Sequence, residues 1–560
     1  MDAHEPGSAG EPTLTHPGYH FWNQFGFTSY PGRTGQSFSE RAQPGDEVKG
    51  IMMRMNLVFA KKHPFIPGFL VSWLVTAALL GAILCACQPA AGPGPVGTPV
   101  VTTALFLSTP HPKPSPTHAS SATAQPTSGP TIPAEMQVQP ENLKGVQVVF
   151  WYPWSGDSAA QVDSIVKDFN QTNVWGIQVT ASAAGSSSML NEEVQSNLVG
   201  GQLANVVAAP IDQLSAWQSA AQVVVPLNDY IQSPDWGLQP QEISDIQPLF
   251  MQQDRLNGNQ LAIPALRDGE VLFYNLTWSN EMGFANPPGT TDQFKAQACA
   301  ALQANVRTQL IDKIGTGGWV IDTGPYTLLS WMQVFGGQPI PTGDSQVYSF
   351  NSEHDQASIN FLLDMFQKSC IWPRRLPTSY EYFTKRMALF YSGMVSDISA
   401  QARLQEYLKS KDQWTVIPYP SDPDHKPVFI VEGPSYAIFR SNPRQQLAAW
   451  LFIRWLGLPR NQAKLVEATG LLPVNISSAD LLKGYSFSNP QWQAAVDLIP
   501  VARPAPNLPS WTTASVVLGD AGWQIFHQAP TPMPVPTILQ QLDDTIPQLL
   551  NYVPTPTTAK

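Results

Sequence analysis

Aromatic and acidic side chains follow several of the short apolar runs that the sequence suggests as strands. Trp151 and Trp154 come directly after the run at residues 146–150, and Asp212 follows the run at residues 205–209. Flat aromatic rings can stack on the apolar faces of a small ligand, and a fixed carboxylate can accept hydrogen bonds from its hydroxyl groups. The alternatives are that the tryptophans pack in a core and that Asp212 caps a helix. The pattern therefore points to a site for a polar organic ligand.

Motifs of common catalytic and cofactor sites are absent from the chain. It contains no G-x-S-x-G, H-E-x-x-H, P-loop or C-x-x-C pattern, and residues 315–318 (GTGG) do not complete the dinucleotide pattern G-x-G-x-x-G. Carboxylates are numerous enough for a glycan hydrolase, but the sequence does not show a pair at the separation that such an enzyme needs. We therefore predict a binding protein that is not an enzyme and holds no metal or cofactor, with the hydrolase as the alternative.

Composition restricts the partners. The 560 residues carry a net charge of −11, and only 13% of them are charged. Such a chain is poorly suited to bind nucleic acid or an anionic membrane surface through charge, so we expect neither as a partner.

The elements that would position these side chains alternate between strand and helix. Val162, Ile165, Val166 and Phe169 recur at helical spacing after the first apolar run, and a second strand is expected at residues 177–180. Strands that alternate with helices predict an α/β fold with a parallel sheet, in which ligands bind at the carboxyl ends of the strands.

Residues 257–281 carry a resemblance to a known family. Asn257-Gly258 is a turn signal, two β-runs follow, and the polar stretch at residues 264–270 between them could lead the main chain from one lobe to another. With the "P-P-x-T-x-D-x-F" order at residues 287–294, this stretch resembles the maltose-binding type of bacterial extracellular solute-binding protein. Further short sequence motifs, among them "G-x-x-P-V" at residues 470–474, extend the resemblance over residues 143–553.

The resemblance implies a two-lobed periplasmic-binding-protein-like fold of type II, with a ligand cleft between hinge-linked lobes. The chain would cross between lobes near Asp268, Gly393 and Ser441. These crossings divide the chain into lobe 1, residues 143–267 and 395–440, and lobe 2, residues 268–394 and 441–560.

The resemblance also implies ligand contacts. Asp268 lies where maltose-type proteins place an acidic contact, although Arg267 beside it could pair with it instead. Tyr326 matches a tyrosine that stacks on sugar, but Gly324 replaces a glutamate of some members, so the hydrogen-bonding pattern can differ. Asp397 falls just after the expected second crossing. The complete set of expected ligand-binding residues is Trp151, Trp154, Asp212, Asp268, Tyr326, Asp397 and Trp511, the last in a late loop that would close one edge of the cleft.

The first 142 residues read as an export and tethering region. Residues 1–50 are polar and are expected to be disordered or to precede the true start, which would be Met52, Met53 or Met55. Residues 51–87 have the basic, apolar and small-residue layout of an export signal, and they end in a sequence that resembles the lipobox, with Cys87 as the acylated residue. An uncleaved membrane-spanning anchor is the alternative. Residues 88–142, rich in Pro, Thr and Ser, form the expected tether.

Cys299 and Cys370 both fall in lobe 2 on this interpretation, so we predict a disulfide between them, with two buried free thiols as the alternative. The chain is then expected to be a monomeric lipoprotein on the outer face of the cell membrane. It would bind a sugar or oligosaccharide and deliver it to the permease subunits of an ABC importer. Other polar solutes, such as glycerol phosphodiesters, stay open, as does a sensor or adhesion lipoprotein without a permease.

Overall fold

The computed structural model describes residues 137–551, except residues 312–314, 343–346, 374, 423 and 528–532. The predictions for Cys87, the export signal and most of the tether lie outside the described residues. Within the described part of the chain, no helix combines the length and apolar character needed to cross a membrane.

The first lobe is built on a mixed sheet with the strand order β2-β1-β3-β13-β6. Strands β1 and β2 are parallel, as are β1 and β3, whereas β13 runs antiparallel to both β3 and β6. β3 is buried along most of its length because helices cover both faces of the sheet. The strands of this sheet are β1 (Gln147–Tyr152), β2 (Gln178–Ala183), β3 (Val206–Pro210), β6 (Ile263–Pro264) and β13 (Pro434–Ile438).

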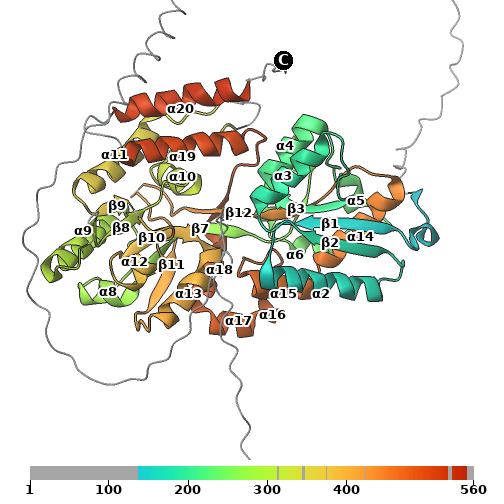
Figure 1. The fold of residues 1–560 in the computed structure, drawn as a ribbon, viewed down its shortest axis with the longest axis horizontal. Helices are drawn as coiled ribbons and strands as arrows, with labels where there is room; N and C mark the ends of the chain where they lie inside the picture. Colours follow the sequence, from blue (N-terminus) through green and yellow to red (C-terminus); the bar gives the residue numbers. More distant parts are fainter. Residues whose placement is uncertain are drawn as a thin grey trace, which may run out of the picture. The chain divides into compact units, whose positions relative to one another are not determined.

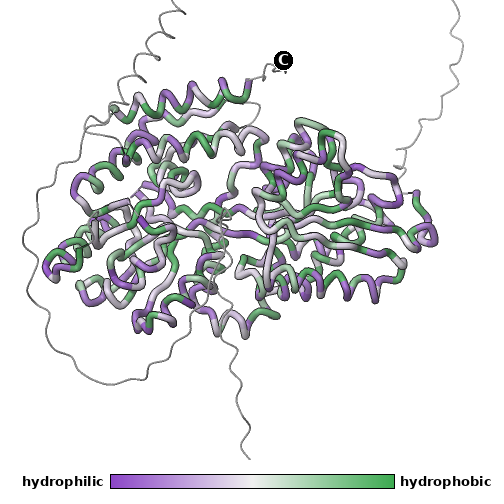
Figure 2. The backbone as a smooth tube through the Cα atoms, viewed as in Figure 1, coloured by the Kyte–Doolittle hydropathy of each residue, from purple (hydrophilic) through white to green (hydrophobic). Residues whose placement is uncertain are grey.

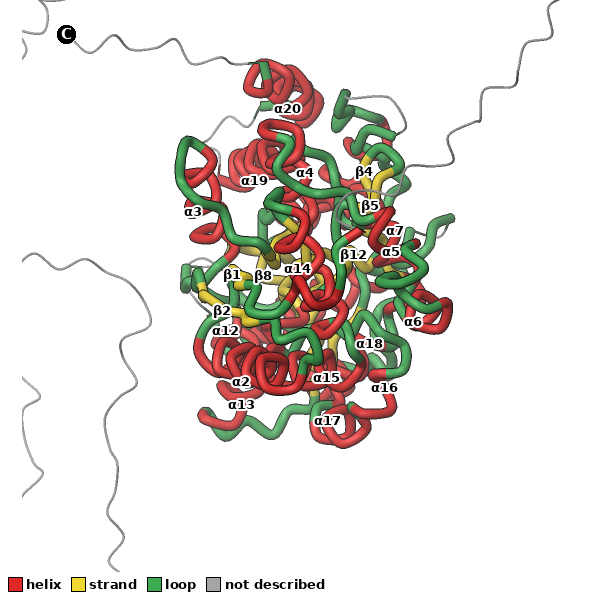
Figure 3. The backbone as a smooth tube through the Cα atoms, turned by 90° about the vertical axis from the view of Figure 1, so that its right-hand side faces the viewer, coloured by secondary structure: helices red, strands yellow, loops and turns green. Residues whose placement is uncertain are grey.

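Helices α3 (Ser187–Leu198) and α4 (Ile211–Ala221) lie on one side of this sheet (Figures 1 and 3). On the other side lie α2 (Gly156–Thr172), α14 (Pro443–Leu456) and α15 (Pro459–Thr469). The residues of α2 that recur at helical spacing are all buried, as predicted: Val162, Ile165, Val166 and Phe169.

Short elements connect β3 to β6: α5 (Asn228–Gln232), α6 (Pro240–Asp245), α7 (Pro248–Gln253) and the hairpin of β4 (Arg255–Leu256) and β5 (Asn259–Gln260). The hairpin turns at Asn257 and Gly258, whose φ angles of 50° and 79° are both positive. A two-residue turn of this kind requires positive φ at both positions, and Asn-Gly is the pair that adopts it most readily. The turn predicted from these two residues is confirmed.

The second lobe contains a sheet with the strand order β14-β12-β7-β10-β8-β9, and β11 pairs with β7 beside β12. All eight residues of β7 are buried, because β10 pairs with one of its edges while β11 and β12 share the other. The strands are β7 (Asp268–Asn275), β8 (Trp319–Ile321), β9 (Ile371–Pro373), β10 (Phe390–Met394), β11 (Trp414–Ile417), β12 (Phe429–Glu432) and β14 (Ala502–Pro504).

Two groups of helices cover the second sheet (Figure 1). One face carries α9 (Thr291–Thr308), α10 (Pro325–Val334), α11 (Glu353–Gln367), α19 (Trp511–His527) and α20 (Val535–Leu550), and the other carries α12 (Tyr380–Thr384), α13 (Ile398–Tyr407) and α18 (Pro490–Val496). A short helix, α8 (Leu276–Glu281), follows β7. Hydrophobic and hydrophilic residues alternate along α20 (Figure 2), and its apolar side is buried. A disulfide joins Cys299 of α9 to Cys370, just before β9.

Three segments of the described chain connect the lobes. The first comprises residues 265–267, between β6 and β7, and the second is Gly433, between β12 and β13. The third follows α15 and includes α16 (Ser478–Leu481) and α17 (Lys483–Ser488) before it reaches α18. Gly433 has a φ of 149°, and a Cβ there would lie 2.7 Å from the carbonyl oxygen of Leu266. The first two crossings therefore touch, and a side chain at position 433 has no room.

Two of the expected crossings differ from the structure. Gly393 lies on β10, which pairs with β7 and β8 in the second sheet, so residues 395–432 belong to the second lobe and not to the first. Ser441 precedes α14, which packs with α15 on the first lobe, so residues 441–469 belong there and not to the second lobe. The positions near Gly393 and Ser441 were wrong because local pattern does not say which sheet a strand joins.

Arg267 holds the three crossings together. Its side chain is fully buried, and its guanidinium Nη2 lies 2.7 Å from Oδ1 of the equally buried Asp254. Nη1 donates to the carbonyl oxygen of Pro434 and lies within 3.2 Å of Ser435 Oγ, next to the second crossing. The main chain of Arg267 exchanges two hydrogen bonds with Leu472 of the third crossing. The alternative pairing of Arg267 with Asp268 is not the one that the structure contains.

Candidate functional site

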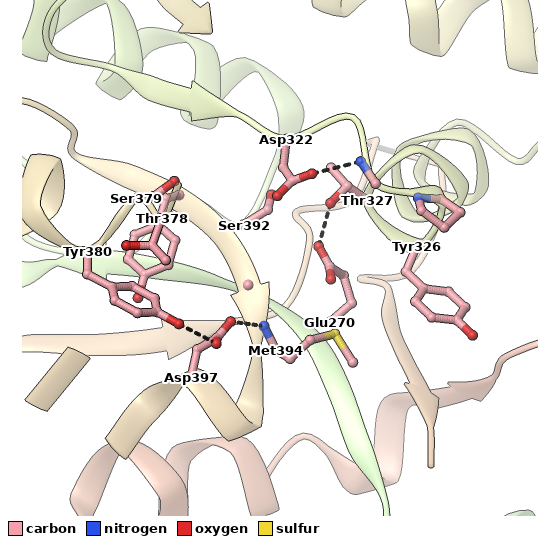
Figure 4. A pocket seen from close by; sticks show the side chains of 14 residues that line it. Glu270, Asp322, Tyr326, Thr327, Thr378, Ser379, Tyr380, Ser392, Met394 and Asp397 are labelled. Atoms are coloured by element: carbon pink, nitrogen blue, oxygen red, sulfur yellow. Dashed lines mark hydrogen bonds between the residues drawn. The ribbon is translucent and has the colours of Figure 1, made fainter. Parts of the chain in front are cut away.

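A pocket of about 280 Å³ opens beside the crossings, and the second lobe provides all of its lining (Figure 4). Its walls come from β7, from the loop between β8 and α10, from the residues that lead into α12, and from β10 with the 3₁₀ turn Val395–Asp397 that follows. Three carboxylates line it: Glu270, Asp322 and Asp397. The rest of the lining consists of tyrosines, small hydroxyl side chains, glycines, one proline and one methionine, without a lysine, arginine, histidine or amide side chain.

Glu270 lies at the inner wall of the pocket and is 5% exposed. Its Oε1 accepts hydrogen bonds from Thr327 Oγ1 at 2.6 Å and from the hydroxyl of Tyr419 at 2.7 Å (Figure 4 shows the first). Burial raises the pKa of Glu270 to about 8; the two hydrogen bonds act against this rise, and repulsion from Asp322 and Asp397 adds to it. Glu270 therefore retains its proton near pH 7 unless a ligand supplies compensating charge.

Asp397 and Tyr380 form a pair at the opposite side of the pocket. The Tyr380 hydroxyl donates to Oδ1 of Asp397 at 2.5 Å, and the Met394 amide donates to Oδ2 at 2.9 Å (Figure 4). The position of Asp397 is thus set by the turn that begins at Met394. Tyr391 also lines the pocket, and its hydroxyl is buried without a hydrogen-bond partner among the described residues.

Asp268 lies at the start of β7, next to the first crossing. Its Oδ1 accepts hydrogen bonds from the amides of Gly269 at 2.9 Å and Ser396 at 3.0 Å. Burial raises the pKa of Asp268 to about 6, against the hydrogen bonds from Ser396 and Gly269 and with a contribution from the charge of Asp397. Asp268 therefore connects the first crossing to the turn that holds Asp397.

Tyr326 lies in the first turn of α10, and charged groups of both lobes act on its hydroxyl. Burial raises its pKa well above the ordinary value, and the charges of Glu432, Asp212 and Glu270 add to that effect. Asp212 belongs to the first turn of α4 in the first lobe, and burial raises its pKa to about 6 against backbone hydrogen bonds. Glu432 precedes the second crossing, and its pKa rises to about 8 through burial and then through the charges of Asp268 and Asp212. Asp212 of one lobe thus faces acidic and phenolic groups of the other.

Two of the residues expected to bind ligand, Tyr326 and Asp397, line the pocket. Asp268 lies beside it, hydrogen-bonded to the amide of Ser396, and the charge of Asp212 in the first lobe acts on Tyr326. Trp511 lies behind Tyr326, with 6.2 Å between the ring centroids, but it is only 1% exposed and presents no free face.

The two tryptophans of the first lobe lie elsewhere. Trp151 is part of the core formed with α3 and α4, and Trp154 is half-buried with its ring centroid 5.9 Å from that of Tyr152. Neither lines the pocket, so core packing describes Trp151 better than ligand stacking does.

Sequence reasoning missed Glu270, Asp322, Tyr380 and Glu432. Glu270 had a usable signal, because it follows Asp268 by two residues in a strand and therefore lies on the same face. The others lie in segments whose neighbours in space come from distant parts of the chain. No group of histidine, cysteine, aspartate and glutamate in the described ranges is arranged to hold a metal ion.

Comparison with known proteins gives consistent matches. The family model for bacterial extracellular solute-binding proteins matches residues 164–500. A putative binding protein of Brucella abortus (strain 2308) is 23% identical over 282 residues, which cover 50% of this chain and 65% of the relative. The chain thus spans slightly less than two thirds of that relative. The sn-glycerol-3-phosphate-binding periplasmic protein of Escherichia coli (strain K12) is 21% identical over 365 residues, or 62% of this chain and 78% of that protein.

Solved structures share the fold. The cyclic alpha-maltosyl-1,6-maltose binding protein from Arthrobacter globiformis superposes with a TM-score of 0.61 at 18% identity, over 72% of this chain and 99% of the other. UgpB from Mycobacterium tuberculosis in complex with glycerophosphocholine gives a TM-score of 0.59 at 16% identity, over 72% and 98%. At these identities the likeness establishes the two-lobed α/β fold.

Proposed function

Because this chain belongs to the bacterial extracellular solute-binding protein family, we propose that it is the solute receptor of an ABC importer and that its ligand is a sugar or oligosaccharide. The observation that carries the ligand class is the pocket beside the crossings. Tyr326 and Tyr380 offer aromatic surface there, and the carboxyl groups of Glu270 and Asp397 offer hydrogen-bonding partners for hydroxyl groups.

The position of the site suits a receptor that closes on its ligand. The charge of Asp212 of the first lobe raises the pKa of Tyr326 and Glu432 of the second, which supports a ligand that extends from the pocket toward the first lobe. A ligand that contacts both lobes favours the conformation in which they are close, and that conformation is the one that a permease would recognise. We propose a monomer that binds its ligand without turnover, in keeping with a family of binding proteins.

A thermal-shift screen of the full chain against mono- and oligosaccharides tests this function. A ligand at one hundred times its dissociation constant should stabilise the protein by about 2.7 kcal/mol, which is readily seen as a raised midpoint. Analysis of the sugar after incubation separates a receptor, which returns it intact, from a glycan hydrolase, which cleaves it. The absence of any shift with sugars would refute the sugar class.

The export and anchoring of the chain belong to the same proposal. We propose that residues 51–87 direct export, that Cys87 is acylated, and that residues 88–142 tether the two lobes to the outer face of the membrane. Cys87→Ser should move the protein from the membrane fraction to the released fraction. A variant that stays in the membrane fraction would instead indicate an uncleaved anchor.

A further inference from the structure

The charge of the pocket restricts the ligand further than its shape does. Its lining includes Glu270, Asp322 and Asp397. Further carboxyl groups act on each other nearby: the charge of Asp397 raises the pKa of Asp268, and the charges of Asp268 and Asp212 raise that of Glu432. The charges of Glu432 and Asp212 also raise the pKa of Tyr326. The positively charged side chain nearest to them in the sequence is Arg267, which is fully buried and paired with Asp254. Among the described residues, no basic side chain lines the pocket itself. A phosphate group would therefore meet carboxylates and hydroxyl groups there, without a described cation to compensate its charge.

The pocket also contains a buried donor that lacks a partner. Tyr391 is 1% exposed, lines the pocket, and its hydroxyl forms no hydrogen bond within the described structure. The ring centroids of Tyr380 and Tyr391 are 6.1 Å apart, which places Tyr391 on the same side as the Asp397–Tyr380 pair. Leaving a buried polar group without a partner is costly, so this hydroxyl indicates a place for a polar group of the ligand.

The described carboxylates of the pocket do not form a metal site. No group of three or more acidic, histidine or cysteine side chains in the described part of the chain is arranged as a metal site. The hydroxyl groups of Ser379, Ser392 and Thr378 line the same pocket. A ligand that suits this lining carries positive charge on a larger framework that also bears hydroxyl groups.

We infer that the ligand is an amino sugar or an oligosaccharide of amino sugars, with a protonated amine bound between Glu270 and Asp397. This inference rests on the proposed function, since it names the ligand class of the same pocket. The second oxygen of Glu270 has no hydrogen-bond partner among the described residues, while its first oxygen is held by Thr327 and Tyr419. An ammonium group would supply a donor to that free oxygen and would relieve the repulsion between Glu270 and Asp397.

The burial of Glu270 supports the inference. Its pKa is raised to about 8 by burial, with Asp322 and Asp397 contributing, so Glu270 is protonated near pH 7 and a bound cation would favour its ionised form. Binding of a protonated amine should therefore release protons from the protein, which calorimetry in buffers of different ionisation enthalpy can count.

The test compares amino sugars with their N-acetylated partners, because acetylation removes the charge and keeps the ring. Glucosamine, galactosamine and the glucosamine di- and trisaccharides would be titrated into the full chain by calorimetry, in a buffer acidic enough to protonate the amine. The same titrations would use each acetylated partner, maltotriose and glycerol 3-phosphate. At least one amine should bind about tenfold or more tightly than its acetylated partner, as expected for a hydrogen bond to a charged group.

The variant Glu270→Gln tests whether the preference for the amine over its acetylated partner arises in this pocket. Glutamine retains an oxygen that can accept from Thr327 and Tyr419 and loses only the charge, so the preference for the amine should fall to about twofold or less. Glu406→Gln on the exposed part of α13 removes a carboxylate that does not line the pocket and should leave the preference unchanged. The unfolding transition of each variant shows whether it is folded.

The outcomes separate the inference from the function on which it rests. Equal or tighter binding of the acetylated sugars or of maltotriose would overturn the amino-sugar inference and leave a sugar receptor. Binding of glycerol 3-phosphate alone, or of no probe, would overturn both. An amine preference that persists in Glu270→Gln would also overturn the assignment to this pocket.

Discussion

Replacement of Glu270 by glutamine should stabilise the protein near neutral pH and have little effect at acidic pH. Glu270 is 5% exposed, and burial raises its pKa from the ordinary value of 4.5 to about 8. The side chain of glutamine has the same length, and its oxygen can accept the hydrogen bonds of Thr327 and Tyr419. The substitution therefore removes a titrating group and leaves the packing nearly unchanged.

The sign follows from the proton that each state binds. Below about pH 4.5 the Glu270 carboxyl is protonated in both the folded and the unfolded chain, so titration makes no difference to stability. Between about pH 4.5 and pH 8 the unfolded chain loses this proton while the folded chain keeps it, and stability falls as pH rises. Each pKa unit corresponds to about 1.4 kcal/mol, so the loss attributable to Glu270 reaches at most about 5 kcal/mol by pH 8. Glutamine cannot lose a proton, so the variant escapes this loss.

Chemical denaturation of both proteins at several pH values between 5 and 8 measures the effect. Buried neighbours such as Asp268 and Glu432 titrate in both proteins, so the difference between variant and parent isolates Glu270. That difference should grow in favour of Glu270→Gln as pH rises, whereas Glu406→Gln on the exposed face of α13 should show a nearly flat difference. If the difference for Glu270→Gln stays within about 1 kcal/mol over the whole interval, the carboxyl is not held in its buried, protonated form.

Three further substitutions test the crossings and the disulfide. Arg267→Met leaves Asp254 buried and unpaired, so the free energy of unfolding should fall by about 3–5 kcal/mol in chemical denaturation. Adding Asp254→Leu to the same chain should restore much of this loss. A fall of less than about 1 kcal/mol in Arg267→Met would contradict the role given to this ion pair. Gly433→Ala places a Cβ 2.7 Å from the Leu266 carbonyl oxygen at a φ of 149°, and should cost about 1–3 kcal/mol by the same measurement, whereas Gly484→Ala, which meets nothing within 4 Å, should cost much less. Removal of the disulfide in the double variant Cys299→Ala/Cys370→Ala should lower stability by about 2–5 kcal/mol, and an unchanged unfolding midpoint would show that the bond does not form.

Local pattern was sufficient for most of the elements. The spacing of Val162, Ile165 and Phe169 led to α2, and the pair Asn257-Gly258 led to the hairpin turn, because each depends on neighbours in the sequence. The assignment of strands to sheets depends instead on long-range pairing. β11 and β12 fall within residues 395–440, which were expected in the first lobe, yet both pair with β7 in the second. Nothing within either segment distinguishes these two outcomes.

The part of the candidate site that could be predicted consists of residues at the starts or ends of helices and strands. Asp268, Tyr326 and Asp397 could be placed beside the cleft because each stands at the start or end of an element in the family-like order. Trp151 could not be placed, since which face of β1 is covered by α3 and α4 depends on where these helices pack. Glu432 was missed because its role depends on the second crossing, which was expected elsewhere.

The crossings and the pocket are connected through the chain itself. Asp268 directly follows Arg267 at the first crossing, and Glu432 directly precedes Gly433 at the second, so two of the cleft carboxylates are attached to the segments that join the lobes. The charge of Arg267 is paired with Asp254 inside the hinge and offsets only part of the rise in the pKa of Glu432. Asp212 of the first lobe raises the pKa of Glu432, which means that approach of the lobes brings like charges together. A ligand that supplies positive charge at this point lowers the free energy of the closed arrangement more than that of an open one, and this difference is what a receptor needs to report an occupied site.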